Sequence, residues 1–144
     1  MVKIYVDGSC KGNPGGPGGW GVFAVFDNGD SEELSGADKS TTNNRMEMYA
    51  AIEGIKKYIQ EENIHIYTDS KYLDNGINLW LKDWKKNNWK TSTKSDVKNK
   101  DLWMILDQLN SSHNQISWHW VKGHSGDYGN ERADKLAKAA SNSI

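Results

Sequence analysis

The sequence predicts a single α/β domain in which a mixed β-sheet is flanked by helices. The chain has 144 residues, of which 36% are hydrophobic, and this is enough for one core. Three apolar segments joined by turn residues come first, and later apolar segments alternate with stretches of helical periodicity. Short turns favour antiparallel neighbours, whereas strands separated by helices favour parallel ones, so we expect both kinds of pairing.

The first half of the chain contains most of the strand signals. Alternating apolar residues at Val2, Ile4 and Val6 predict a strand over residues 2–7, and two further strands are expected over 20–26 and 32–36. Residues 8–19 contain both prolines and many glycines, which is typical of a loop. The sequence Asn-Gly-Asp at 28–30 predicts a hairpin turn between the second and third strands.

The second half alternates helices and strands. Apolar residues every three or four positions predict a helix over 43–60, with Thr42 or Asn43 as its N-cap. A strand over 64–68 is followed by Asp69-Ser70, which we expect to cap a helix with an apolar stripe from Leu73 to Trp84. A helix around 102–109, a strand over 116–121 and a helix around 133–140 complete the order βββαβααβα, with a short extra helix allowed in the lysine-rich segment.

Composition excludes several classes of protein. The mean hydropathy is −0.81, and no apolar run approaches the roughly 20 residues of a membrane-spanning helix. The N-terminus reaches Asp7 before it could form the apolar part of a secretory signal, so we expect a cytoplasmic protein. The single Cys10 cannot form an internal disulfide, and four scattered histidines do not suggest a zinc finger.

Positive charge is concentrated in one segment. Residues 82–100 contain seven lysines and two aspartates, a local net charge of +5, whereas the rest of the chain carries −6. Trp84 and Trp89 interleave with these lysines, which suits a segment that binds phosphates, although a solvated loop is an equally good interpretation of the charge alone. Trp80 and Trp84 continue the helical stripe and are expected in the core, so Trp89 beside Lys90 is the better candidate for a ligand contact.

Four carboxylates stand at the ends of predicted elements or beside apolar faces: Asp7, Glu47, Asp69 and Asp134. Clustered carboxylates repel one another unless a cation neutralises them or some bind protons. Mg²⁺ prefers oxygen ligands and suits phosphodiester chemistry. Taken singly, Asp69 is also an ordinary helix cap, and Asp134 belongs to an acidic helix face that solvent alone would explain.

Several motifs, read together, resemble type 1 ribonuclease H. They are Asp7-Gly8-Ser9-Cys10, Gly12-Asn13-Pro14-Gly15, Thr41-Thr42-Asn43-Asn44-Arg45-Met46-Glu47, Thr68-Asp69-Ser70, Trp120-Val121-Lys122-Gly123-His124 and Asn130-Glu131-Arg132-Ala133-Asp134. The resemblance covers nearly the whole chain in order. It implies the ribonuclease H-like fold, with a five-stranded mixed sheet in the order 3-2-1-4-5, and hydrolysis of the RNA strand of RNA–DNA hybrids with Mg²⁺, Mn²⁺ also serving.

The resemblance also assigns catalytic roles. It implies that Asp7, Glu47, Asp69 and Asp134 hold two metal ions about 4 Å apart, one activating water and the other stabilising the leaving 3′ oxygen. Products would carry 5′-phosphate and 3′-hydroxyl ends. His124 would move a proton or assist product release, whereas its sequence context alone fits an ordinary exposed loop histidine.

Nucleic-acid contacts are implied by the same motifs. Thr42 and Arg45 resemble the family's contacts to a phosphate of the DNA strand, with Asn13 beside them. The backbone from Cys10 through Gly12 to Asn13, with the side chains of Asn44 and Glu47, would face 2′-hydroxyls of the RNA strand, which distinguish RNA from DNA. The segment 80–100 resembles the basic protrusion of bacterial members, and the expected contacts in it are Trp80, Lys85, Lys86, Trp89 and Lys90.

Two departures from the family pattern affect these expectations. Lys71 stands where bacterial relatives often have glutamine, which favours a phosphate contact over a neutral amide contact. The sequence ends at Ile144, shortly after the last predicted helix, without the longer tail of some relatives.

Two other functions remain open from the sequence. A binding module would hold hybrids without cutting them, but all four acids are present, which favours an enzyme. A nuclease domain of a larger polyprotein such as a reverse transcriptase is the second alternative. The Met1 start and the basic protrusion favour a stand-alone enzyme, which we expect to be a monomer.

Overall fold

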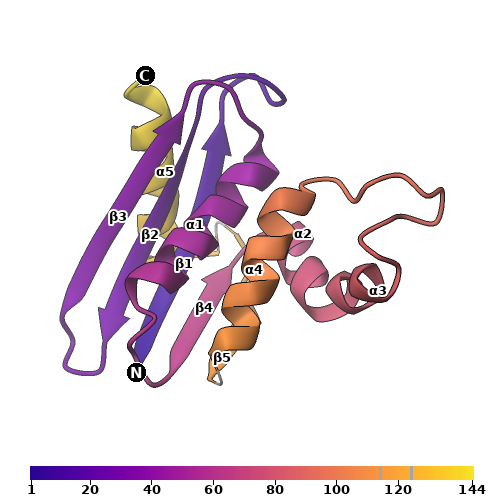
Figure 1. Cartoon of the computed structure of the whole chain (residues 1–144). Helices are drawn as coiled ribbons and strands as arrows, with labels where there is room; N and C mark the ends of the chain where they lie inside the picture. The colour runs from indigo at the N-terminus through magenta and orange to yellow at the C-terminus, as the bar shows by residue number, and fades with distance from the viewer. Residues whose placement is uncertain (114, 124) are drawn as a thin grey trace.

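The sheet has five strands and combines antiparallel with parallel pairing. A computed structural model describes residues 1–113, 115–123 and 125–144. The strands are β1 (Val2–Cys10), β2 (Gly18–Phe26), β3 (Ser31–Asp38), β4 (Ile64–Thr68) and β5 (Ile116–Trp120). They lie in the order β3-β2-β1-β4-β5 (Figure 1), with β1, β2 and β3 antiparallel and β4 and β5 added in parallel. The predicted mixed sheet and its strand order are thus confirmed.

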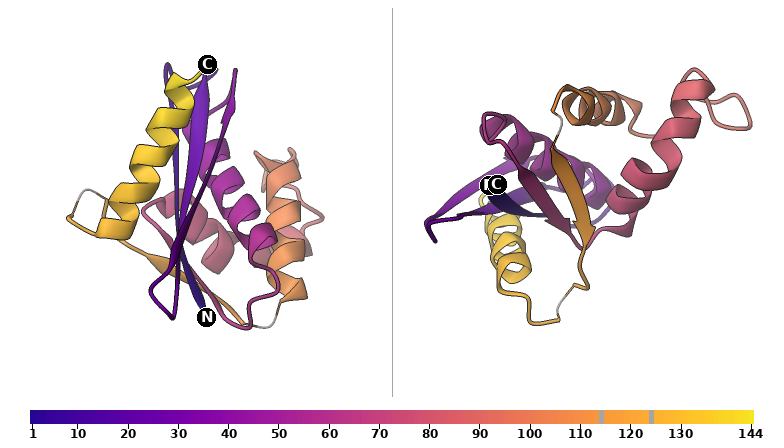
Figure 2. Two further views of the ribbon diagram at one scale, coloured as in Figure 1. Left: turned by 90° about the vertical axis from the view of Figure 1, so that its left-hand side faces the viewer. Right: turned by 90° about the horizontal axis from the view of Figure 1, so that it is seen from below.

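Helices cover the two faces of the sheet unequally. α1 (Asn43–Lys57) and α4 (Lys100–Ser112) lie on one side, and α5 (Tyr128–Asn142) lies on the other (Figure 2). α5 packs on β1, β2 and β3. Three short helical pieces follow β4: α2 (Lys71–Asn75), the π-helical turn η1 (Gly76–Trp80) and α3 (Leu81–Lys86). Counted as one helical run, these three pieces reproduce the predicted order of elements. No helix in the described part of the chain is both long and apolar enough to span a membrane.

The main core lies between the sheet and α1. Val2, Ile4 and Val6 are fully buried because the even-numbered residues of β1 face this side. The other fully buried large side chains of the core include Met48, Ile52, Ile55, Ile64, Ile66, Leu73, Leu102, Trp103 and Leu106. This packing makes β1 and α1 the most rigidly held supports for any side chain at their ends.

The opposite face depends on small residues. α5 crosses β2 at Gly19 and Gly21, where Ala133 and Ala137 are fully buried. A Cβ atom on Gly21 would lie 2.6 Å from the carbonyl oxygen of Ala133, which is closer than real Cβ contacts allow. The missing side chains therefore set how closely α5 approaches the sheet.

Some element boundaries differ from those predicted. β1 continues to Cys10 because the residues after Asp7 pair with the start of β2, which shortens the predicted loop. Thr42 is the N-cap of α1, as predicted, since its hydroxyl accepts a hydrogen bond from the backbone N–H of Arg45 at 3.1 Å. At the next helix Ser70, rather than Asp69, supplies the capping oxygen, which leaves the Asp69 carboxylate free for another role.

The long apolar stripe predicted from Leu73 to Trp84 is helical but interrupted. The π-helical turn begins at Gly76, which lies directly against the indole of Trp103. Leu73 and Leu81 of the stripe are buried in the core, whereas Trp80 and Trp84 are half-buried; Trp84 packs on Trp80 and on Trp103, with ring centroids 5.8 and 5.4 Å apart. Beyond α3 the chain leaves the body of the domain and returns to α4 (Figure 1).

Candidate active site

Three acidic side chains from different elements meet near the centre of the sheet. Asp7 lies on β1, the central strand, Asp69 directly follows the parallel neighbour β4, and Glu47 lies in the second turn of α1. Gly8 allows α1 to approach β1 here, because a Cβ atom at this position would be 2.5 Å from the backbone nitrogen of Glu47. The fold therefore brings together residues that are 22 to 62 positions apart in the sequence.

The geometry of this group suits a cation. One carboxylate oxygen from each of Asp7, Glu47 and Asp69 lies within 4.8 Å of the others. Asp7 and Glu47 are buried, at 4% and 8% exposure. Within the described part of the chain, Oε2 of Glu47 is buried and has no hydrogen-bond partner. A buried carboxylate oxygen without a partner is costly, and a divalent cation would satisfy it.

Burial also changes the protonation of these acids. The pKa of Asp7 is raised to about 7, chiefly by burial; the neighbouring carboxylates Asp69 and Asp134 also raise it, whereas hydrogen bonds from Glu47 and Gly8 lower it. Burial, followed by the charge of Asp7, raises the pKa of Glu47 well above its ordinary value. Without a cation the cluster therefore retains protons at pH values where isolated carboxyls are ionised.

Asp134, the fourth predicted acid, lies at the border of the cluster. A hydrogen bond between its carboxyl and that of Asp7 contributes to the raised pKa of Asp7. Oδ2 of Asp134 also forms an ion pair with Nζ of Lys138, one turn later on α5, at 3.0 Å. The structure thus places Asp134 beside Asp7 but not in the close group of three. His124 lies outside the described residues.

A hollow of about 320 Å³ lies beside the start of α1. Its lining residues come from the glycine-rich loop, the N-terminus of α1 and the end of the lysine-rich segment: Asn13, Pro14, Thr42, Asn43, Asn44, Lys98 and Asn99. Three of these, Asn13, Thr42 and Asn44, were predicted as nucleic-acid contacts. Lys98 and Asn99 were not singled out, because nothing in the sequence shows that the far end of the lysine-rich segment returns to α1.

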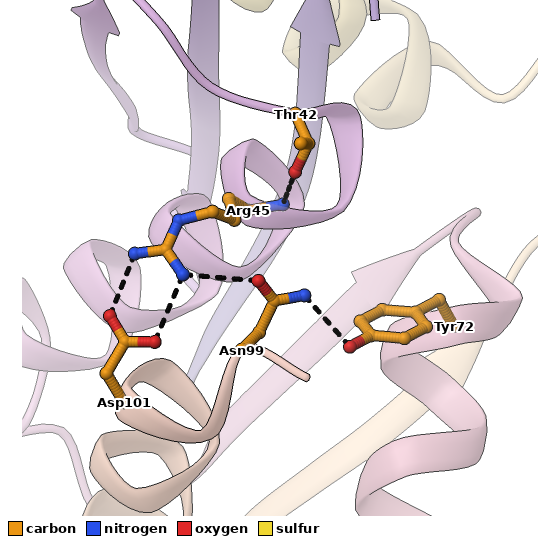
Figure 3. A network of polar contacts seen from close by, with 5 residues as sticks. All are labelled: Thr42, Arg45, Tyr72, Asn99 and Asp101. Carbon is orange, nitrogen blue, oxygen red and sulfur yellow. Dashed lines mark hydrogen bonds and ion pairs between the residues drawn. The ribbon is translucent and has the colours of Figure 1, made fainter. Parts of the chain in front are cut away.

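Arg45 is held at this site by an acid that the sequence did not suggest. Its guanidinium donates to both carboxylate oxygens of Asp101, at 3.0 and 2.8 Å, and to Oδ1 of Asn99 at 3.2 Å (Figure 3). Hydrogen bonding from Arg45 lowers the pKa of Asp101. Asn99 in turn donates to the hydroxyl of Tyr72 at 3.0 Å. The network connects α1, α2 and the start of α4, so Arg45 is ordered before any ligand binds.

The predicted basic contacts are partly neutralised by nearby acids. Lys85 pairs with Asp107 at 3.2 Å, and Lys90 pairs with Asp96 at 2.5 Å. Lys86 is exposed. The +5 charge of the segment is therefore distributed over a surface that also contains ion pairs.

The aromatic residues of the same region are partly used for packing. Trp80 packs edge-on against Tyr72, and Trp89 is half-buried against the core. Lys71 lies over the ring of Trp120, with 5.3 Å between its Nζ and the ring centroid. Each of these residues has a structural contact in addition to the ligand contact predicted for it.

The glycine-rich loop keeps its backbone accessible. The thiol of Cys10 points inward and donates to the carbonyl oxygen of Thr41, 3.4 Å away, which leaves the Cys10 side chain with a structural role. Gly12 is exposed and has a φ of +62°. Oδ1 of Asn13 accepts a hydrogen bond from the backbone N–H of Asn43 at 3.2 Å, which joins the loop to the start of α1.

Comparison with known proteins agrees with the fold. The family model for RNase H matches residues 1–142. The chain is 59% identical over 139 residues to a ribonuclease H from Francisella philomiragia, which covers 96% of this chain and 90% of the relative. LC9-RNase H1, described as a type 1 RNase H with the type 2 active-site motif, superposes with a TM-score of 0.85 at 31% identity, over 99% of this chain and 72% of that one. The fold is also shared by LC11-RNase H1, solved in complex with an RNA/DNA hybrid, with a TM-score of 0.76 at 20% identity over 99% and 98% of the chains.

The sheet has five strands, and the carboxylates cluster where its antiparallel and parallel parts meet. This architecture defines a ribonuclease H-like nuclease. The chain belongs to the RNase H family and is an endoribonuclease.

Proposed function

We propose that the chain hydrolyses the RNA strand of RNA–DNA hybrids with two divalent cations, Mg²⁺ or in its place Mn²⁺, leaving 5′-phosphate and 3′-hydroxyl ends. The family and the fold support cleavage of the RNA strand of hybrids. The observation that carries the cation requirement is the close group of Asp7, Glu47 and Asp69, with the unpartnered buried oxygen of Glu47.

The donor set fits a hard cation. All of its atoms are carboxylate oxygens, the ligands that Mg²⁺ prefers, and none is a sulfur or an imidazole nitrogen. Asp7, Glu47 and Asp69 would hold the cations, with Asp134 completing the site from α5. When bound there, divalent cations supply Lewis-acid activation of water and stabilisation of the leaving oxygen.

The protein's own residues bind and orient the substrate. A phosphate of the DNA strand would enter the hollow beside α1, where the hydroxyl of Thr42 can donate to it and Arg45 supplies positive charge. Arg45 is held in place by Asp101, so little side-chain freedom remains to be lost on binding.

Recognition of the RNA strand would come from the neighbouring surface. The backbone from Cys10 through Gly12 to Asn13 and the side chains of Asn44 and Glu47 would meet 2′-hydroxyls, which only RNA presents. Lys71, which lies above the ring of Trp120 and two residues after Asp69, would contact an RNA phosphate. The lysine-rich segment, with Trp80, Lys85, Lys86, Trp89 and Lys90, would bind more distant phosphates by charge.

His124 would assist the proton transfers of the reaction or the release of product. The assignment rests on its sequence motif, and the near-neutral titration of imidazole suits either step. We expect the active form to be a cytoplasmic monomer.

The proposal is tested with labelled RNA–DNA hybrid, RNA–RNA and DNA–DNA duplexes, each incubated with Mg²⁺ and with a chelator. We expect cleavage of the RNA strand of the hybrid alone, and only with Mg²⁺. Analysis of the product ends should give 5′-phosphate and 3′-hydroxyl. Binding of the hybrid without cleavage would instead indicate a binding module, and cleavage in the presence of the chelator would exclude the cation role of the cluster.

A further inference from the structure

A row of aromatic rings crosses the sheet on the face of α5. The ring centroid of Tyr67 lies 4.8 Å from that of Tyr5 on β1 and 4.7 Å from that of His119 on β5. The row ends at His65 on β4. The strand register places all four side chains on one face, because Tyr5 pairs with Tyr67 and Tyr67 pairs with His119. α5 packs on β1, β2 and β3, so the histidine end of the row lies beyond the contacts of this helix.

The two histidines meet through their nitrogens. Nδ1 of His65 lies 2.9 Å from Nε2 of His119, while the ring centroids are 5.2 Å apart and the planes differ by 16°. With these distances the rings meet edge to edge, so the contact is a hydrogen bond between a ring N–H and a ring lone pair. The imidazoles of His65 and His119 therefore share one N–H proton. Each ring can bind a metal ion through a nitrogen that carries no proton.

We propose that His65 and His119 form a two-imidazole site for a borderline divalent cation, of the class of Zn²⁺, Ni²⁺ or Cu²⁺. Imidazole nitrogen is a preferred ligand for these ions. Metal–nitrogen bonds of about 2.0–2.1 Å in tetrahedral geometry place two ligand nitrogens roughly 3.3 Å apart. The nitrogens of the pair would therefore separate by a few tenths of an ångström, and the two rings would turn so that both lone pairs point to the ion instead of to each other. As the ion binds, the ring that donates the shared N–H moves this proton to its other nitrogen, so both imidazoles stay neutral, and water supplies the remaining ligands.

The surroundings keep the pair ready to bind an ion at neutral pH. Burial lowers the pKa of His119, and the neighbouring His65 and Lys3 lower it further, so its ring is neutral at pH 7. Neutral imidazole is the form that binds metals. Lys3, which pairs with His65 across β1 and β4, opposes a second positive charge and so limits the affinity.

This site differs from the carboxylate cluster in both ligand chemistry and place. Mg²⁺ prefers the oxygens of the cluster, whereas Zn²⁺, Ni²⁺ and Cu²⁺ bind imidazole well. An ion between His65 and His119 would join β4 to β5, the edge strand of the sheet. Such an ion stabilises the folded state by mass action, since the two nitrogens are close together only after folding.

Calorimetric titration with Ni²⁺, in excess Mg²⁺ to occupy the carboxylates, tests the proposal. We expect one Ni²⁺ site in the unmodified protein, and its affinity should fall about ten-fold or more in His65→Asn and in His119→Asn. His113→Asn is the matched control, because both ring nitrogens of His113 already contact backbone groups, of Glu61 and Gln115. Unchanged Ni²⁺ affinity in His65→Asn and His119→Asn, or an equal loss in His113→Asn, would overturn the proposal.

A second variant keeps the test decisive if an asparagine variant fails to fold. Lys3→Ala leaves both imidazoles in place and removes the opposing charge, so Ni²⁺ affinity should rise several-fold. Thermal unfolding gives an independent measurement, since Ni²⁺ should raise the Tm of the unmodified protein and of Lys3→Ala. Ni²⁺ affinity that does not respond to Lys3→Ala would place the ion elsewhere and contradict the assignment.

Discussion

The carboxylate cluster and the lysine-rich segment both contain charged groups, but those of the cluster are mostly buried and those of the segment lie at the surface. Asp7 and Glu47 are buried, and the Glu47 oxygen Oε2 lacks a partner in the described part of the chain. Lys85 and Lys90 are well exposed and already paired with acids. Like charges held together without solvent act as a unit, whereas exposed charges act separately and are screened by salt. We therefore expect all-or-none effects from substitutions in the cluster and graded effects from those in the segment.

The largest effect should come from Asp69→Asn, which keeps the shape of the side chain and removes its charge. We expect cleavage of the hybrid to fall below a thousandth of the wild-type rate, because a cation ligand is lost, while hybrid affinity stays within a few-fold. Single-turnover kinetics in Mg²⁺ and a binding titration measure the two quantities. Cleavage at a tenth of the wild-type rate would show that the cluster does not act as a unit.

A smaller loss is expected from His124→Ala, because a proton carrier assists turnover without holding the cation. The kcat should fall by about 10²-fold or less with little change in KM. Steady-state kinetics between pH 6 and 9 measure this split. Turnover equal to that of the wild type over this range would leave His124 as an ordinary loop residue.

The triple variant Lys85→Ala, Lys86→Ala and Lys90→Ala tests whether the lysine-rich segment gives the graded effects expected of it. We expect KM to rise much more than kcat falls, since distant phosphates are bound equally in the ground and transition states. The slope of log affinity against log salt should decrease by up to about 3 units, one for each lost phosphate contact. An unchanged slope would return the segment to the interpretation of a solvated loop.

Asp96→Asn is the opposite change in the same segment. Asp96 accepts ion pairs from Lys90 and Lys100, at 2.5 and 3.8 Å, so its loss should free positive charge for phosphates. We expect hybrid affinity at low salt to increase by a few-fold, measured by fluorescence anisotropy, with the gain disappearing as salt is raised. Weaker binding would show that Asp96 orders the segment more than it neutralises it.

The smallest effect concerns stability without cations. Because burial raises the pKa of Asp7 to about 7, the folded state binds a proton that the unfolded state releases near pH 4. Stability in chelator should therefore fall as pH rises from 4 to about 7, and Mg²⁺ should restore it. Asp7→Asn should weaken this dependence, with the part due to Glu47 remaining, and raise the Tm in chelator at pH 8 by about 3–5 °C. A Tm of the wild type that rises over this range would contradict the raised pKa.

Much of the fold could be predicted because its signals are local. Strand alternation at Val2, Ile4 and Val6 and the helical spacing from Met48 to Ile59 each reflect burial of one face, and the structure confirms both elements. The π-helical turn at Gly76 could not be predicted, since it depends on the indole of Trp103 in a later helix.

The candidate site also has features that the sequence predicted and features that it did not. Asp7, Glu47 and Asp69 were predicted as a group from their motifs, and the structure brings them together. The pairing of Arg45 with Asp101 was not predicted, because it joins residues 56 positions apart and neither belongs to a distinctive pattern at that spacing. Asp134 was predicted together with them; it lies beside Asp7, and one of its oxygens is paired with Lys138.

Because α5 packs directly on Gly21, the position of Asp134 relative to Asp7 depends on a glycine, which has no side chain. Asp134 directly follows Ala133, whose carbonyl oxygen rests against Gly21. A single added methyl group at Gly21 would push this turn of α5 outward and carry Asp134 away from Asp7, with every carboxylate still present in the sequence. Inspection of the acidic residues alone would then rate as intact a protein in which the proposed fourth ligand lies too far from Asp7.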